Sequence, residues 1–195
     1  PTCHIAFDEA TAILAGDGLQ TLAFEQLLEA QQLPPRTTLR LLAMLTKAAG
    51  IDGMVYGQAI DMAAVNQTLT LPQLEHMPRH KTGAMITASV MMGGMTVGAS
   101  ERQLGALKDY GEAIGLAFQV QDDILDVTTD TAVLGKQQGS DQARNKPTYL
   151  SLLGIDGARQ KAAELHGKSL TALASFDERA DQLRAIADYI VKREY

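Results

Sequence analysis

The stretch GEAIGLAFQVQDDILD, residues 111–126, decides the fold, because its acidic and apolar residues separate onto different sides of a helix. At about 100° per residue, Asp122 and Asp126 lie about 40° apart, with Asp123 in the same third of the helix surface. Gln119 falls on this face as well. Most other positions are apolar, so the stretch predicts a largely buried helix that carries an acidic stripe.

This acidic stripe indicates a site for a hard divalent cation. Carboxylates crowded into a half-buried wall are costly unless a cation neutralises them. Mg²⁺ prefers one or two carboxylates together with waters and substrate phosphates. Asp122, Asp123 and Asp126 are therefore candidate magnesium ligands that would hold a diphosphate through the metal. A solvated acidic face is the alternative that the residues alone leave open.

Helical periodicity continues over almost the whole chain, without strand-like alternation. Helices are expected over residues 7–33, 36–49, 51–65, 81–98, 101–127, 147–154, 156–175 and 177–193. Thr70 and Gln73 match a capping box, and Pro78 should kink or break the helix that follows. The uncharged stretch 82–100 is rich in Gly, Ser and Thr, so we expect a buried helix there and no stable membrane insertion. One all-α domain over residues 1–195 is predicted.

Composition and charge exclude several classes of function. A chain of 195 residues with 46% hydrophobic residues can bury one core, and 5% aromatic content disfavours a sheet. A net charge of −6 without a Lys/Arg cluster argues against nucleic acid as a partner. The one cysteine allows no internal disulfide, and we expect a cytoplasmic location.

Basic residues flank the acidic stripe in the sequence. Lys136 and Lys146 follow it, and Lys81 and Thr82 begin the uncharged stretch. Ammonium groups beside a metal-bound anion suit a diphosphate leaving group, because negative charge accumulates there as the carbon–oxygen bond breaks. An uncharged helix surface that could hold a hydrocarbon tail is formed by Met85, Ala88, Ser89 and Met92.

Together these motifs resemble the trans-isoprenyl diphosphate synthases, most closely the bacterial short-chain farnesyl diphosphate synthases. The matching strings are GLAFQVQDDILDVTTDTAVLGKQQGSD at 115–141, NKPTY at 145–149, HKTGA at 80–84, GQAID at 57–61 and PTCHIAF at 1–7. The resemblance implies a single-domain helical bundle of the isoprenoid-synthase type around a central active-site cavity. It also implies a homodimer and a Mg²⁺-dependent prenyltransferase.

The resemblance also implies roles for individual residues. The metal ligands would be Asp122, Asp123 and Asp126, and the residues in contact with the allylic diphosphate or its metals would be Lys81, Thr82, Gln119, Lys136 and Lys146. Lys81, Asp122 and Lys136 would take part in catalysis. Asp141 would act through water on the metals, and Asp61 is left open between a place near the metal and a packing role.

The reaction implied by the family is prenyl transfer. Departure of diphosphate from dimethylallyl or geranyl diphosphate leaves an allylic cation, which the double bond of isopentenyl diphosphate attacks before a proton is lost. Farnesyl diphosphate is the implied product.

One departure from the family pattern concerns a first D-D-x-x-D on an earlier helix. Asp8, Glu9 and Asp17 do not reproduce it, so we expect the chain to be the C-terminal two thirds of a synthase and, alone, not to make prenyl diphosphates. Two alternatives remain open, a non-catalytic helical subunit that acts as a dimer partner and a terpene cyclase-like lyase. The lysine-containing loop beside an intact D-D-x-x-D favours the synthase.

Overall fold

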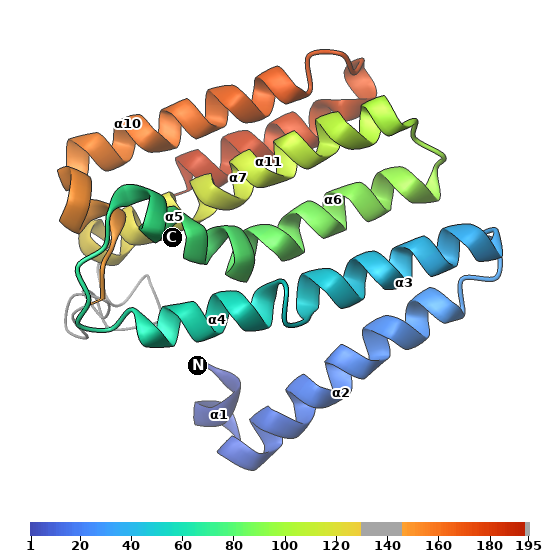
Figure 1. Cartoon of the computed structure of the whole chain (residues 1–195), viewed down its shortest axis with the longest axis horizontal. Coiled ribbons are helices and arrows are strands. Elements are labelled where there is room, and N and C mark those ends of the chain that lie inside the picture. The colour runs from blue at the N-terminus through green and yellow to red at the C-terminus, as the bar shows by residue number, and fades with distance from the viewer. Residues whose placement is uncertain (130–145, 194–195) are drawn as a thin grey trace. The chain divides into compact units, whose positions relative to one another are not determined.

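The computed structural model describes residues 1–129 and 146–193, which are helical wherever they are regular (Figure 1). No strand occurs among these described residues, so the predicted all-α class is confirmed. The chain forms two compact units, residues 1–46 and residues 47–195. The expectation of one domain over all 195 residues stays a prediction.

The first unit contains α1 (Cys3–Ala6), α2 (Glu9–Leu28) and most of α3 (Pro35–Ala49). Asp8 caps α2, because its side chain accepts a hydrogen bond from the Thr11 backbone N–H at 2.7 Å. No residue of α2 is buried. Its exposed large apolar side chains are Ile13, Leu14, Leu19, Leu22 and Leu28.

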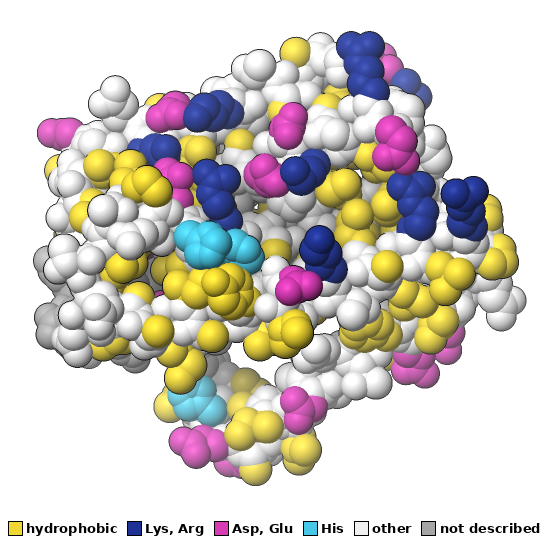
Figure 2. Space-filling view, in the orientation of Figure 1, with side chains coloured by type: hydrophobic (Ala, Val, Ile, Leu, Met, Phe, Trp, Pro, Cys, Tyr) yellow, Lys and Arg dark blue, Asp and Glu magenta, His cyan; other side chains and the backbone are white. Residues whose placement is uncertain are grey.

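The second unit is built around one long helix, α7 (Glu101–Thr128), within one residue of its predicted end. The elements before it are α4 (Met54–Ala63), α5 (Leu71–Pro78), the π-helix η1 (Arg79–Gly83) and α6 (Ala84–Thr96). Those after it are α10 (Tyr149–Ala172), the 3₁₀ turn η2 (Glu178–Ala180) and α11 (Asp181–Lys192). Helices α6, α10 and α11 pack against α7 (Figure 1). On the face in Figure 2, basic and acidic side chains are interspersed.

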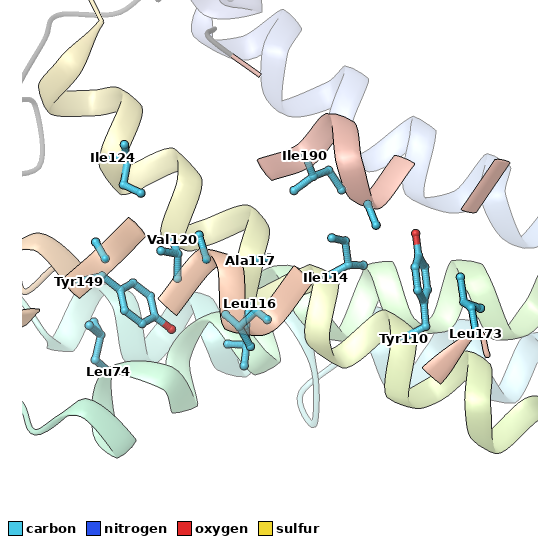
Figure 3. Close-up of a cluster of buried hydrophobic side chains, with 14 of the residues drawn as sticks. Leu74, Tyr110, Ile114, Leu116, Ala117, Val120, Ile124, Tyr149, Leu173 and Ile190 are labelled. Atoms are coloured by element: carbon cyan, nitrogen blue, oxygen red, sulfur yellow. The ribbon is translucent and has the colours of Figure 1, made fainter. Parts of the chain in front are cut away.

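Helix α7 supplies the centre of the hydrophobic core (Figure 3). Ile114, Ala117 and Val120 are each at most 1% exposed. The buried Tyr110 donates its hydroxyl hydrogen to the carbonyl of Leu183 at 2.7 Å, which joins α7 to α11. Because α7 is buried along most of its length, the polar side chains at its C-terminal end are held in fixed positions.

Pro78 breaks the α-helical pattern without ending the helical path. It is the last residue of α5, and the chain continues through the five-residue π-helix η1 into α6. Proline has no N–H to donate to the preceding turn, and a π turn is one of the ways in which a helix absorbs such a defect. The helix expected from residue 81 therefore begins at Ala84, and Lys81 and Thr82 lie in the π turn.

The expected buried helix at 82–100 is only half-buried. Ala88 is the one buried residue of α6, and Ser89 and Gly93 are exposed. None of the helices in the described part of the chain is long and apolar enough to cross a bilayer. The helix break expected near residue 154 is confirmed, because Gly154 has a φ of 68° and kinks α10.

Two glycines of α7, one turn apart, allow the preceding helices to approach closely. A Cβ at Gly111 would lie 2.7 Å from Thr87 Cα, and a Cβ at Gly115 would lie 2.8 Å from Gly83 Cα. Both neighbours are backbone atoms, so an added methyl group would push the helices apart. The approach of η1 to α7 therefore depends on Gly115.

We predict that Gly115→Ala lowers the free energy of unfolding by about 1–3 kcal/mol, because overpacking outweighs the better helix propensity of alanine. Gly105→Ala on the same helix is the matched control. Gly105 is exposed with no atom within 4 Å of an added Cβ, so this change should stabilise by about 0.5–1 kcal/mol. Urea unfolding measures both. Equal stabilisation by the two substitutions would contradict the close packing.

Candidate functional site

A cavity of about 260 Å³ lies in the second unit between α4, α5, η1, α7 and the start of α10. Its charged and amide-bearing lining consists of Asp61, Lys81, Gln119, Asp122, Asp123 and Lys146, and Thr82 also lines it. Apart from Asp61, whose role was left open, these residues are six of the predicted site residues, and the structure brings them together around one cavity. Asp126 does not line this cavity and is 3% exposed. Lys136 and Asp141 lie outside the described residues.

Lys81 is positioned by close packing of α4 on its backbone. A Cβ at Gly57 would lie 2.2 Å from the backbone nitrogen of Lys81, so only glycine fits there. Asp61 follows one turn later on α4, and its Oδ2 accepts a hydrogen bond from Lys81 Nζ at 2.6 Å. The GQAID string therefore supplies both the space for the π turn and the carboxylate that binds its lysine.

Asp61 also binds a second lysine. Lys146 Nζ donates to Asp61 Oδ1 at 2.8 Å, so each carboxylate oxygen accepts one ammonium group. Burial has the largest single effect on the pKa of Asp61 and raises it, because it disfavours the charged carboxylate. The hydrogen bonds and charges of Lys146 and Lys81 together outweigh it, so the pKa of Asp61 lies below its ordinary value of 3.8. Asp61 is thus a charged carboxylate only 5% exposed.

Asp123 is held by neighbouring residues of the protein. Its Oδ1 accepts from Gln119 Nε2 at 2.9 Å, and its Oδ2 accepts from the backbone N–H of Tyr149 at 2.8 Å. Tyr149 is the first residue of α10, where a carboxylate also interacts favourably with the helix dipole. Asp123 is 6% exposed, so these bonds place it in the packing between α7 and α10.

Asp122 faces the cavity with a side chain that is 35% exposed, and it pairs with Arg193 just after α11. The Arg193 guanidinium also stacks on the Phe118 ring at 4.3 Å from its centroid. Gln121 Nε2 donates to the Arg193 carbonyl at 3.0 Å. Arg193 was not among the predicted site residues, because no local sequence pattern links residues 71 positions apart.

The carboxylates around the cavity suit a metal ion that takes its remaining ligands from a bound anion. Within the described part of the chain, no group of three or more His, Cys, Asp or Glu side chains is placed to hold a metal. Asp122 is the candidate ligand that is partly exposed, whereas both oxygens of Asp123 already accept hydrogen bonds. One carboxylate plus substrate phosphates and waters is an arrangement that Mg²⁺ accepts. The ligand roles of Asp122, Asp123 and Asp126 stay predictions.

The uncharged surface expected to hold a hydrocarbon tail is not part of this cavity. None of Met85, Ala88, Ser89 and Met92 is among the lining residues. Ala88 is buried, and Met85 and Met92 are half-buried on α6. The role of this surface in holding a hydrocarbon tail stays a prediction.

Comparison with known proteins identifies the family. The family model described as polyprenyl synthetase matches residues 1–188. The chain belongs to the polyprenyl synthetase family. A curated relative, farnesyl diphosphate synthase of Escherichia coli (strain K12), is 49% identical over 199 residues, which cover 99% of this chain and 67% of the relative. The chain spans about two thirds of the length of the curated relatives it matches.

Solved structures of family members confirm the predicted isoprenoid-synthase type of fold. The geranylgeranyl pyrophosphate synthetase of Pyrococcus horikoshii matches with a TM-score of 0.87 and 30% identity, over 100% of this chain and 70% of that one. A geranyltransferase from Helicobacter pylori, in complex with magnesium and isoprenyl diphosphate, matches with a TM-score of 0.83 and 35% identity. That match covers 98% of this chain and 62% of the H. pylori chain.

We predict that Asp123→Asn lowers the free energy of unfolding by about 1–3 kcal/mol. The amide that replaces one carboxylate oxygen cannot accept from Gln119 or Tyr149, so it leaves a buried donor unpaired. The matched control is Asp109→Asn, an exposed position of the same helix, which should change stability by less than about 0.5 kcal/mol. Thermal and urea unfolding test the pair, and similar stabilities would refute the structural role of Asp123.

Proposed function

We propose that this chain carries the allylic diphosphate side of a Mg²⁺-dependent trans-prenyltransferase. The substrates would be dimethylallyl or geranyl diphosphate and isopentenyl diphosphate, and the product would be farnesyl diphosphate. The observation that carries the proposal is the arrangement of Asp122, Lys81 and Lys146 around one cavity. A carboxylate available to a metal and two ammonium groups are complementary to a metal-bound diphosphate.

The chemistry follows from where charge develops. When the carbon–oxygen bond of an allylic diphosphate breaks, the electron pair stays on the diphosphate oxygen. Lys81 and Lys146 stabilise that charge through N–H bonds from positions already held by Asp61. Thr82 and the Gln119 amide, which also line the cavity, contribute neutral polar groups beside the leaving group. The lysines therefore act more strongly on the transition state than on the bound substrate.

Magnesium is proposed as the metal, with Asp122 as the residue that would hold it. When bound, it would act as a Lewis acid on the diphosphate and neutralise part of its charge. Support comes from the H. pylori relative, whose structure contains magnesium and isoprenyl diphosphate. Arg193 now pairs with Asp122, so its guanidinium would have to yield at least part of that carboxylate to a metal.

A farnesyl product is supported by degree of similarity. The E. coli farnesyl diphosphate synthase is 49% identical to this chain, whereas the geranylgeranyl pyrophosphate synthase of Catharanthus roseus is 40% identical.

A chimera tests whether these residues form a working active site. Residues 1–195 would replace the aligned two thirds of the E. coli farnesyl diphosphate synthase. With Mg²⁺, geranyl diphosphate and labelled isopentenyl diphosphate, we expect farnesyl diphosphate. The Asp122→Ala chimera should lose about 100-fold or more in turnover, because metal-linked charge stabilisation is lost.

Asp109→Ala serves as the matched control in the same chimera and should leave turnover unchanged. Circular dichroism and thermal melting would show whether each chimera is folded. A folded chimera that forms no product would contradict the proposal and favour the non-catalytic subunit.

We also propose that the chain forms a homodimer through α2. This helix of 20 residues buries none of them, and a second copy of the chain would remove its apolar side chains from water. Sedimentation equilibrium at micromolar concentration should give twice the monomer mass. A Leu19→Glu, Leu22→Glu variant should be monomeric, and a monomeric unaltered chain would contradict the dimer.

A further inference from the structure

Asp61 occupies a position that none of the predicted diphosphate or metal contacts explains. It lies on α4, yet its carboxylate joins Lys81 of the π turn to Lys146 ahead of α10. The two lysines are 20 and 85 residues away in the sequence. The side chain of Asp61 is 7% exposed, whereas those of Lys81 and Lys146 are 34% and 22% exposed. The carboxylate is thus more buried than either of the lysine side chains that it binds.

We propose that Asp61 is a positioning residue, which fixes the spacing and direction of two ammonium groups that bind the diphosphate. This inference rests on the proposed function. Each ammonium group has three N–H donors and uses one on Asp61, so two remain for a ligand. The three side chains together carry one excess positive charge, but Asp122 and Asp123 bring the charged lining of the cavity to −1, so we expect the anion to bind together with Mg²⁺.

The physical benefit is preorganisation. Free lysine side chains are flexible, and a ligand that orders them loses affinity to their rotamer entropy. Asp61 orders both lysines before the ligand arrives, from a rigid helix that is itself fixed by the Gly57 contact. Because a small displacement of the ammonium groups weakens every bond to the diphosphate, the position of this carboxylate matters as well as its charge.

Asp61 is not suited to bind the metal. Both of its oxygens accept hydrogen bonds from ammonium groups at 2.6 and 2.8 Å, and two cations at that distance repel a divalent ion. A purely structural role, as a connection between α4, η1 and the start of α10, is the other possibility. The two roles predict different results, because a purely structural connection would affect the stability of the protein but not the affinity of the folded protein for a diphosphate.

The test is calorimetric titration of the 195-residue chain with inorganic pyrophosphate and Mg²⁺. We expect the unaltered chain to bind, Asp61→Asn to bind at least tenfold more weakly, and Asp61→Glu to fall between the two. Asparagine can accept from only one lysine and turns an N–H₂ toward the other. Glutamate keeps the charge but moves it by one methylene group. Asp109→Asn, on the exposed surface of α7, is the matched control and should bind like the unaltered chain.

A double-mutant cycle with Lys81→Met separates positioning from stability. If Asp61 acts through the lysines, Asp61→Asn should weaken pyrophosphate binding less in the Lys81→Met background than in the unaltered chain, because only Lys146 remains to be positioned. Unchanged affinity in folded Asp61→Asn overturns the positioning role and leaves the proposed function standing. If Asp61→Asn does not fold, the Asp61→Glu variant provides the test. Pyrophosphate affinity of Asp61→Glu equal to that of the unaltered chain would then overturn the positioning role. No pyrophosphate binding by the unaltered chain overturns both proposals.

Discussion

The backbone of the π-helix η1 is enclosed from two sides by glycines, and the site depends on that close packing. Gly57 of α4 lies against Lys81, and Gly115 of α7 lies against Gly83. At both contacts an added Cβ would come within 3 Å of a backbone atom. The π turn begins directly after Pro78, which has no N–H to continue the α-helical hydrogen bonding. Local backbone chemistry therefore determines where Lys81 and Thr82 meet the cavity.

Three aspartates around this cavity have different roles because their neighbours differ. Asp61 accepts two lysines, Asp123 accepts an amide and the N-terminal N–H of α10, and Asp122 pairs with Arg193 while remaining partly exposed. Carboxylates of equal intrinsic chemistry thus become an anchor for cations, a helix-packing group and a candidate metal ligand. Residue type and spacing alone do not distinguish these roles, because the partners come from other helices.

Much of the fold follows from sequence patterns that are local. The apolar periodicity of α7, the capping box at Thr70 and the break at Gly154 depend on residues within one or two turns, and each agrees with the structure. The π turn after Pro78 was harder to predict, because proline is compatible with a kink, a break or a wide turn. Asp61 was marked by the family-like string GQAID, which left its role open between a place near the metal and packing. No sequence pattern marked Arg193 as a site residue.

The central claim is that a lysine pair held by Asp61 forms the diphosphate-binding side of the cavity. The most direct measurement is a crystal structure of the chain with Mg²⁺ and inorganic pyrophosphate. The account predicts pyrophosphate oxygens at about 2.7–3.2 Å from the Nζ atoms of Lys81 and Lys146, with Asp61 still bonded to both and Asp122 on the metal. Pyrophosphate bound elsewhere, or Asp61 bound to the metal, would contradict it.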